Sequence, residues 1–124
     1  MGYENDFVDE KPVEINIDGR IFMYKPTTGG DENEWLKDTI IVDPETKLTK
    51  INWPAYTKHR IGNIVSVPYS DEMIKEKFSL TVGWNKLSLD EKYKLLGKMK
   101  SGLFDKLVDK MKDIDAVDEK AAKN

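Results

Sequence analysis

Residues 88–114 read SLDEKYKLLGKMKSGLFDKLVDKMKDI and carry the strongest structural signal in the chain. Apolar side chains recur there at spacings of three and four residues, which places them on one face of an α-helix. The intervening positions are mostly Lys, Asp and Glu, as on the solvent side of such a helix. The apolar face consists of Leu89, Tyr93, Leu96, Met99, Leu103, Leu107, Met111 and Ile114, widened by Leu95, Phe104 and Val108.

Two local signals divide this stretch. Ser88 and Glu91 have the spacing of a capping box, in which the serine hydroxyl and the glutamate side chain each bond the other residue's backbone amide. Ser101-Gly102 then interrupts the pattern. Either one helix kinks there, or it ends and Ser101 caps a second helix. We favour the second alternative, which predicts a pair of C-terminal helices.

The N-terminal part of the chain carries a β signal. Apolar and polar residues alternate over 13–17, Asp18-Gly19 follows, and residues 21–24 are apolar. An Asp-Gly pair between such runs favours a type I′ hairpin turn, because that turn needs positive φ angles. A two-stranded hairpin is marginal by itself. We therefore predict an α+β fold: an N-terminal β-hairpin packed on a predominantly helical body with a C-terminal helical pair.

The segments between the hairpin and the C-terminal helices read as short elements. Residues 31–37 are expected to form a helix with Asp31 as N-cap, and residues 38–42 either continue it or form a short strand. A helix is expected from Pro54 to about residue 67, and another over 71–78 behind the cap Ser70. Whether residues 38–53 contain a third strand is left open by the pattern.

Length and composition limit the organisation and the function. The 124 residues suit a single domain, for which we predict residues 12–115, with a flexible arm over 1–11 and a flexible tail over 116–124. The net charge of −3 gives no bulk attraction to nucleic acids or anionic membranes. The chain has no cysteine and no apolar run long enough to cross a bilayer, so we expect a cytoplasmic protein.

Residues with catalytic or metal-binding chemistry are few. His59 is the only histidine, and its neighbours Lys58 and Arg60 are cations, so we interpret it as a solvent-facing helix residue. Asp31, Glu32 and Glu34 lack the spacing of a calcium loop and are better explained by helix capping. We therefore predict no enzymatic activity, no cofactor and no metal site.

Two stretches have the composition of a binding surface. Trp53, Tyr56, Lys58, His59 and Arg60 interleave aromatic side chains with cations, a pattern that can stack on bases and hold phosphates. The acidic background of the chain argues against that interpretation, and core aromatics beside a solvated basic edge explain the pattern better.

The second stretch is the apolar face of the last helix. Such a face usually belongs to the core, but flexible Met-bearing faces also suit adaptable partner binding. We do not expect a hairpin and short helices to cover so long a face completely. The residues for which we predict contact with a protein partner, or with a second copy, are Leu103, Phe104, Leu107, Val108 and Met111.

Several motifs taken together resemble a known family. They are Ile15-Asn-Ile-Asp-Gly-Arg-Ile-Phe, Lys25-Pro-Thr-Thr-Gly-Gly-Asp-Glu-Asn-Glu-Trp-Leu, Trp84-Asn-Lys-Leu-Ser, Leu95-Leu and Leu103-Phe-Asp-Lys-Leu. This arrangement resembles the small tail assembly chaperones of long-tailed, siphovirus-like phages and related archaeal viruses. The resemblance implies a non-enzymatic protein of the host cell cytoplasm that binds the tape measure protein and helps recruit tail tube protein. The alternatives are a structural virion protein of the tail or head completion, and a small nucleic-acid-binding regulator.

Overall fold

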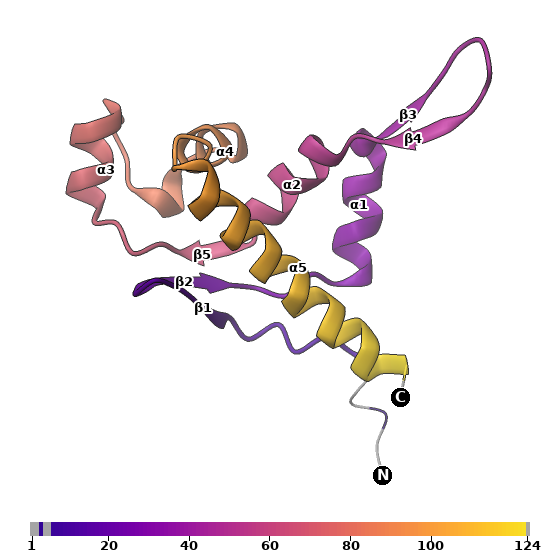
Figure 1. Ribbon diagram of the computed structural model, residues 1–124, viewed down its shortest axis with the longest axis horizontal. Coiled ribbons are helices and arrows are strands. Elements are labelled where there is room, and N and C mark those ends of the chain that lie inside the picture. The colour runs from indigo at the N-terminus through magenta and orange to yellow at the C-terminus, as the bar shows by residue number, and fades with distance from the viewer. Residues whose placement is uncertain (1–2, 4–5, 124) are drawn as a thin grey trace.

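The computed structural model describes residue 3 and residues 6–123, and it confirms the α+β fold class (Figure 1). Three strands form one sheet in the order β1-β2-β5, and two further strands, β3 and β4, form a separate sheet. The strands are β1 (Val13–Ile17), β2 (Arg20–Tyr24), β3 (Ile40–Val42), β4 (Thr49–Ile51) and β5 (Ile64–Ser66). The helices are α1 (Gly29–Thr39), α2 (Trp53–Ile61), α3 (Asp71–Phe78), α4 (Leu89–Leu96) and α5 (Ser101–Lys123), with a 3₁₀ turn η2 (Trp84–Lys86).

The predicted N-terminal hairpin is confirmed. Asp18 and Gly19 have φ angles of 51° and 88°, as a hairpin turn with positive φ requires, and the strands pair with Ile15 opposite Phe22. Paired residues share a face of the sheet, so Phe22 and Tyr24 of β2 lie on the same side as the apolar residues of β1. The buried residues of that face are Ile15, Ile17, Phe22 and Tyr24.

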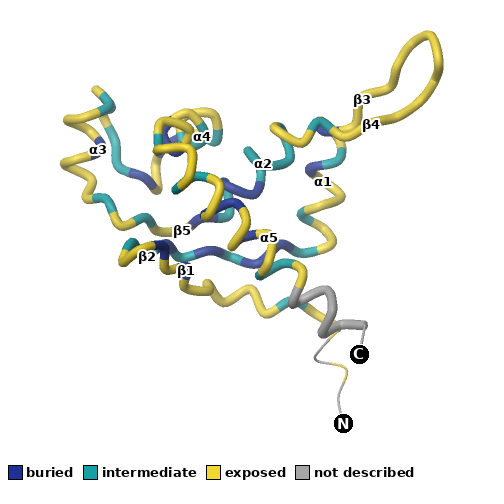
Figure 2. The backbone as a smooth tube through the Cα atoms, viewed as in Figure 1, coloured by how far each residue is buried: buried dark blue, intermediate teal, exposed yellow. Residues whose placement is uncertain are grey.

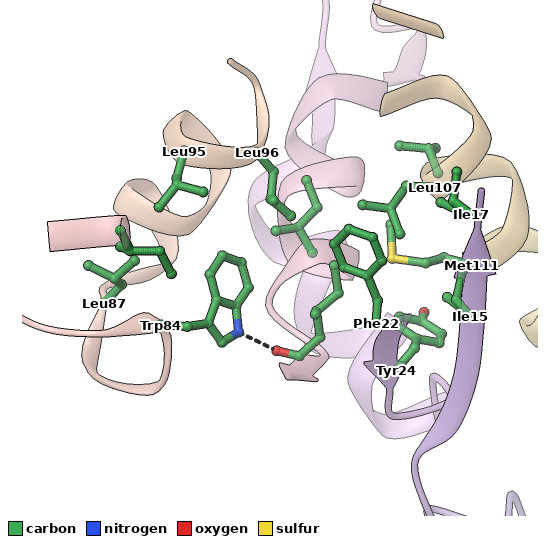
Figure 3. Close-up of a cluster of buried hydrophobic side chains, with 14 residues drawn as sticks. Ile15, Ile17, Phe22, Tyr24, Trp84, Leu87, Leu95, Leu96, Leu107 and Met111 are labelled. Carbon is green, nitrogen blue, oxygen red and sulfur yellow. Dashed lines mark hydrogen bonds between the residues drawn. The ribbon is translucent and has the colours of Figure 1, made fainter. Parts of the chain in front are cut away.

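The third strand of the main sheet was not predicted. The helix expected to run from Pro54 to about residue 67 ends at Ile61, and Ile64–Ser66 instead pairs antiparallel with β2. The chain turns away from the helix at Gly62, and the β-branched residues that follow complete the free edge of β2. A side-chain hydrogen bond also holds Ile64–Ser66 in place: the Nε1 atom of Trp84 donates to the buried Ile64 carbonyl at 2.9 Å (Figure 3).

Helix α5 packs across the main sheet and closes the core. Figure 1 shows it running diagonally over the strands, and Figure 3 shows Leu107 and Met111 close to the side chains of Ile15 and Ile17. Leu107 and Met111 are fully buried. The buried core consists of Ile15, Ile17, Phe22, Tyr24, Ile61, Ile64, Ile74, Trp84, Leu87, Leu95, Leu96, Leu107, Val108 and Met111.

The predicted C-terminal helical pair is also confirmed. Helix α4 starts behind the capping box, in which Ser88 Oγ accepts from the Glu91 amide (3.2 Å) and Glu91 Oε1 accepts from the Ser88 amide (3.0 Å). It ends before Gly97, and α5 begins at Ser101. Ser101 is therefore the first residue of the helix and not its N-cap as predicted, since the Phe104 amide donates to the Lys100 carbonyl. Ser70 caps α3 as predicted, with its hydroxyl accepting from the Met73 amide.

The start of α1 differs from the prediction. Its N-cap is Thr28 and not Asp31, so Gly29 and Gly30 form the first helical turn instead of a loop. Thr28 Oγ1 accepts from the Asp31 amide (3.0 Å), and Asp31 Oδ2 accepts from the Thr28 amide (3.1 Å). Threonine and aspartate three residues apart thus form their own capping box, which lengthens the helix by one turn.

The predicted boundaries of the domain are only partly covered. Helix α5 continues to Lys123, through most of the segment 116–124 that we expected to be a tail. Residues 1–2 and 4–5 of the expected arm, and residue 124, lie outside the described residues. The flexibility of both ends stays a prediction. Within the part of the chain that is described, no helix is both long and apolar enough to cross a membrane.

Replacement of Met111 by alanine tests the role of α5. We expect Met111→Ala to lower the free energy of unfolding by about 2–5 kcal/mol, because the side chain is fully enclosed and its removal leaves a cavity. Urea unfolding followed by circular dichroism measures the change. Lys110→Ala, one position earlier on the exposed side of α5, is the matched control and should change stability little; equal effects of both would contradict this packing.

Candidate functional site

Most of the predicted binding face of α5 is buried in the monomer. Leu107, Val108 and Met111, three of the five predicted partner-binding residues, are buried in the core of the monomer. The physical reason is that α5 packs across β1, where Leu107 and Met111 lie close to Ile15 and Ile17. Leu103 and Phe104 are half-buried and pack against the same core. Partner contact through these last two residues stays a prediction.

Exposed apolar side chains gather instead on the second sheet. We call residues 40–51, which comprise β3, β4 and the turn between them, the hairpin arm. It projects from the body of the protein, and every residue in it is exposed (Figure 2). Leu48 in the arm is 70% exposed, and Trp53 at its base is 61% exposed. The exposed large apolar residues of this region are Ile40, Ile41, Val42, Leu48, Ile51 and Trp53.

The turn of the hairpin arm is well defined by its own hydrogen bonds. Asp43 Oδ1 accepts from the backbone amides of Glu45 (2.8 Å) and Thr46 (3.2 Å), and these bonds hold the pKa of Asp43 below its usual value. The Asp43 amide donates to the Leu48 carbonyl (2.9 Å), and Lys47 takes a positive φ of 61°. The arm is therefore an ordered β-hairpin with a specific turn.

The two faces of the hairpin arm differ in polarity. Ile40 lies opposite Ile51, and Val42 lies opposite Thr49, so these four side chains share one apolar face. Ile41 lies opposite Lys50 on the other face. The first face is the one that continues toward the body of the protein, because Ile51 also lines a hollow there.

This hollow, with a volume of about 500 Å³, lies at the base of the hairpin arm. Its lining residues are Glu32, Leu36, Ile51, Trp53, Tyr56, Arg60 and Lys112. Tyr56 packs edge-on against both Trp35 and Trp53, with ring centroids 5.3 and 5.9 Å apart. Burial, followed by the negative charge of Glu32, raises the pKa of Tyr56 to about 12. The hollow thus combines apolar and aromatic walls with charged groups of both signs.

The basic side chains of the nucleic-acid-like stretch are all engaged by carboxylates. Lys58 and Arg60 form ion pairs with Asp90 and Asp115, and His59 contacts Asp38. His59 Nε2 lies 2.7 Å from Asp38 Oδ1, and the imidazole stacks on Trp35 at an interplanar angle of 9°. His59 is therefore held between a carboxylate and an indole and is not the solvent-facing residue we expected. This arrangement leaves no row of free cations for a phosphate backbone in the described part of α2.

A buried polar cluster forms around Asp115. Its Oδ2 accepts hydrogen bonds from Arg60 Nε (2.9 Å), the Tyr24 hydroxyl (2.8 Å) and Thr27 Oγ1 (2.7 Å), while its Oδ1 accepts from the Thr27 amide (2.9 Å). The Arg60 and Asp115 side chains are only 9% and 10% exposed. The cluster joins α5 to α2 and to the loop between β2 and α1.

The pKa shifts of Tyr24 and Arg60 indicate that this cluster has a structural role. Burial, together with the neighbouring carboxylate of Asp115, raises the pKa of Tyr24 well above its usual value, so the phenol stays a neutral donor. For Arg60, burial lowers the pKa, but its hydrogen bond to Asp115 and the charges around it outweigh burial and raise it. Both oxygens of Asp115 are occupied by donors from the protein itself. The cluster therefore offers no free nucleophile or ligand atom.

Neither the Asp115 cluster nor the hairpin arm was identified from the sequence as a site. Asp115 stood at the boundary of the expected tail, among several other acidic residues, and no local pattern marks it. The arm did carry a signal, because the β-branched run 40–42 before Asp43-Pro44 indicated a possible strand. Among the described residues, no group of three or more His, Cys, Asp or Glu side chains is arranged to hold a metal ion.

Comparisons of this chain with protein-family models, with curated proteins and with solved structures find no match. The function is therefore inferred from the geometry and from the motifs of the sequence. The feature that stands out on geometric grounds is the hairpin arm together with the hollow at its base, since this is where exposed apolar side chains are concentrated.

Removal of the central carboxylate tests the structural role of the buried cluster. We expect Asp115→Ala to lower the free energy of unfolding by about 3–5 kcal/mol, because Arg60 then remains buried without a counter-charge. Urea unfolding at neutral pH measures this. The exposed neighbour Asp113 provides the control. If Asp113→Ala and Asp115→Ala both lowered the free energy of unfolding by a similarly small amount, the cluster would contribute little to stability.

The raised pKa of Tyr24 predicts a loss of stability at alkaline pH. In the unfolded chain tyrosine ionises near its ordinary pKa of 10.0, whereas the folded protein keeps Tyr24 protonated above that value. The stabilising contribution is therefore complete below about pH 10 and decreases as the pH rises further. We expect Tyr24→Phe to be less stable at pH 7 but to lose stability less steeply between pH 9 and 11. Urea unfolding at these pH values measures how the free energy of unfolding of each protein depends on pH. The same pH dependence in the wild type and in Tyr24→Phe would contradict the prediction.

Proposed function

We propose that this protein is a non-enzymatic assembly factor that binds a partner protein through the hairpin arm and the hollow at its base. The observation that carries the proposal is the concentration of large exposed apolar side chains on one projecting segment. Contiguous apolar surface of this kind on a folded monomer commonly marks an interaction site. A lone two-stranded hairpin is marginal in water, so a partner that covers it also stabilises it.

The shape of this surface suits an amphipathic helix of the partner. The apolar face formed by Ile40, Val42 and Ile51 leads into a hollow with aromatic walls, where the apolar side of a helix can dock. Glu32 and Lys112 lie at the same hollow and provide charges of both signs for the polar side of that helix. The tryptophan at the base of the arm, Trp53, is the kind of residue that dominates such contacts.

The specific function we propose is that of a tail assembly chaperone of a siphovirus-like phage or archaeal virus. The support for it is the resemblance of the motifs over residues 15–36 and 84–107 to that family. The client is then the tape measure protein, a long helical chain prone to aggregation, bound in the host cell cytoplasm, with tail tube protein as a further partner. We propose the hairpin arm as the binding surface because three of the five residues predicted on α5 are buried in the monomer, while contact through Leu103 and Phe104 stays a prediction.

A structural virion protein is the second candidate. The observation that favours it is the projection of the hairpin arm from the body, since a subunit of a tail or head-completion ring can hold its neighbour with such an arm. The two functions differ in the fate of the protein. A chaperone is absent from purified virus particles, whereas a structural protein is present in stoichiometric amounts, and mass spectrometry of the particles separates them.

Substitution of Trp53 tests the proposed binding surface. We expect the wild-type protein, when co-expressed, to keep the tape measure protein encoded next to it soluble, and Trp53→Ser to lose most of that effect. The melting temperature should change little, because the Trp53 side chain is 61% exposed. The soluble fraction of the client and its co-purification are the measurements.

The matched control is Val65→Ser, which removes a 40% exposed apolar side chain from β5, outside the arm and the hollow. It should retain full chaperone activity. If Trp53→Ser and Val65→Ser lowered the soluble fraction of the client equally, the proposed site would be wrong. If the wild-type protein did not solubilise the tape measure protein, the proposed client would be wrong.

A further inference from the structure

The outer edge of β3 has free backbone groups. In the hairpin arm the Asp43 amide bonds inward to the Leu48 carbonyl, and in an antiparallel pair the inward direction alternates along the strand. The amide and carbonyl of Val42 and the carbonyl of Ile40 therefore point away from β4. The Ile40 amide is already used, since it donates to the Leu36 carbonyl at the end of α1. Among the described residues, β3 pairs with β4 alone.

The two edges of the hairpin arm differ in how well they are protected. Natural edge strands usually carry a lysine or another charge that discourages pairing with a further strand. Strand β4 follows this rule, because Lys50 lies at its centre and Lys47 precedes it. Strand β3 consists of Ile40, Ile41 and Val42, without a charge or a proline. All three side chains are exposed, so this edge is open to another strand.

We propose that β3 pairs in antiparallel register with β3 of a second copy of this chain, about a two-fold axis at Ile41, to form a four-stranded sheet. In this register Ile41 lies opposite the partner's Ile41, and Ile40 lies opposite the partner's Val42. The Val42 amide of each copy then donates to the free Ile40 carbonyl of the other. The pairing satisfies the outward-facing amide of Val42 and the outward-facing carbonyl of Ile40 in both copies.

The charges of the arm select β3 over β4 and favour a second copy as the occupant. A two-fold axis on β4 would place Lys50 directly against the partner's Lys50, and like charges in directly opposed positions are destabilising. On β3 the same symmetry brings together only isoleucine and valine, which favour each other across strands. The sequence of β3 is thus compatible with its own inverted copy, as an isologous interface requires.

This pairing doubles the apolar surface proposed to bind the client. A two-fold axis perpendicular to the sheet keeps equivalent faces on the same side, so the face formed by Ile40, Val42 and Ile51 continues into the same face of the second arm. The contact itself involves three residues per copy and two backbone hydrogen bonds. It is much smaller than a standard interface. We therefore expect a weak, concentration-dependent dimer.

A cysteine at the two-fold axis provides the first test. The chain has no cysteine, so Ile41→Cys introduces a single thiol. In the proposed register the two thiols face each other at a non-hydrogen-bonded position, where Cα atoms are about 4.5 Å apart, a separation that a disulfide can bridge. Mild oxidation of the purified full-length variant should yield a disulfide-linked dimer.

Lys50→Cys, on the same face of the arm but on β4, is the matched control and should cross-link at least tenfold more slowly. Cross-linking at equal rates would overturn the proposed register. Non-reducing gel electrophoresis and mass spectrometry measure both rates. Since no client is present in this assay, its result is independent of the chaperone proposal.

Charge substitutions at the same position provide the second test. Sedimentation equilibrium of the wild-type protein at rising concentration should show a monomer–dimer equilibrium. Ile41→Lys and Ile41→Glu should each remain monomeric, because each places like charges at the axis, whereas an equimolar mixture should dimerise. Circular dichroism checks that each variant is folded, as expected for a side chain that is 41% exposed.

Either of two results would overturn the proposal. One is a wild-type protein that stays monomeric at the highest concentration reached. The other is association of the single variants that is as strong as that of their mixture.

Discussion

The packing of α5 against the three-stranded sheet is the contact on which the rest of this fold depends. The inner faces of β1 and β2 are apolar, and Leu107 and Met111 cover them from the other side. The short helices α2, α3 and α4 are too small to cover that face alone, and they pack around the edges of the helix–sheet layer (Figure 1). A sheet with one open apolar face would not be stable in water, so this face has to be covered by α5. The apolar side chains that do not take part in this packing then remain at the surface.

The buried cluster around Asp115 supplements this apolar packing with directional bonds. Hydrophobic contact alone tolerates sliding of a helix along a sheet, whereas four hydrogen bonds to the Asp115 carboxylate fix α5 at this position relative to Tyr24, Thr27 and Arg60. An ion pair that is about nine-tenths buried adds little net stability over an apolar pair of the same size. Its effect is on the specificity of the arrangement, because any other register would leave a buried charge without a partner.

Most elements with local signals could be predicted from the sequence, although the N-cap of α1 was placed at Asp31 and not at Thr28, and strand β5, which depends on a distant partner, could not be predicted. The turn at Asp18-Gly19 and the capping box from Ser88 to Glu91 are contained within four residues, and both were identified correctly. Strand β5 was assigned to a helix because its three residues become a strand only when they pair with β2. The burial of the predicted binding residues also depends on a distant contact. A hairpin and short helices were not expected to cover the whole face of α5, but Leu107, Val108 and Met111 are buried where α5 packs across β1 and the rest of the core.

The hairpin arm follows from the same distribution of apolar residues. Once α5 has packed on the main sheet, the described residues provide no second layer for the apolar side chains of β3 and β4, because these two strands form a separate sheet that projects from the body (Figure 2). The ends of two helices fix the base of the arm, because α1 ends where β3 begins and β4 is followed by Asn52, the N-cap of α2. The two helices thereby hold the arm away from the body, and this is the physical reason for our proposal that another chain covers it.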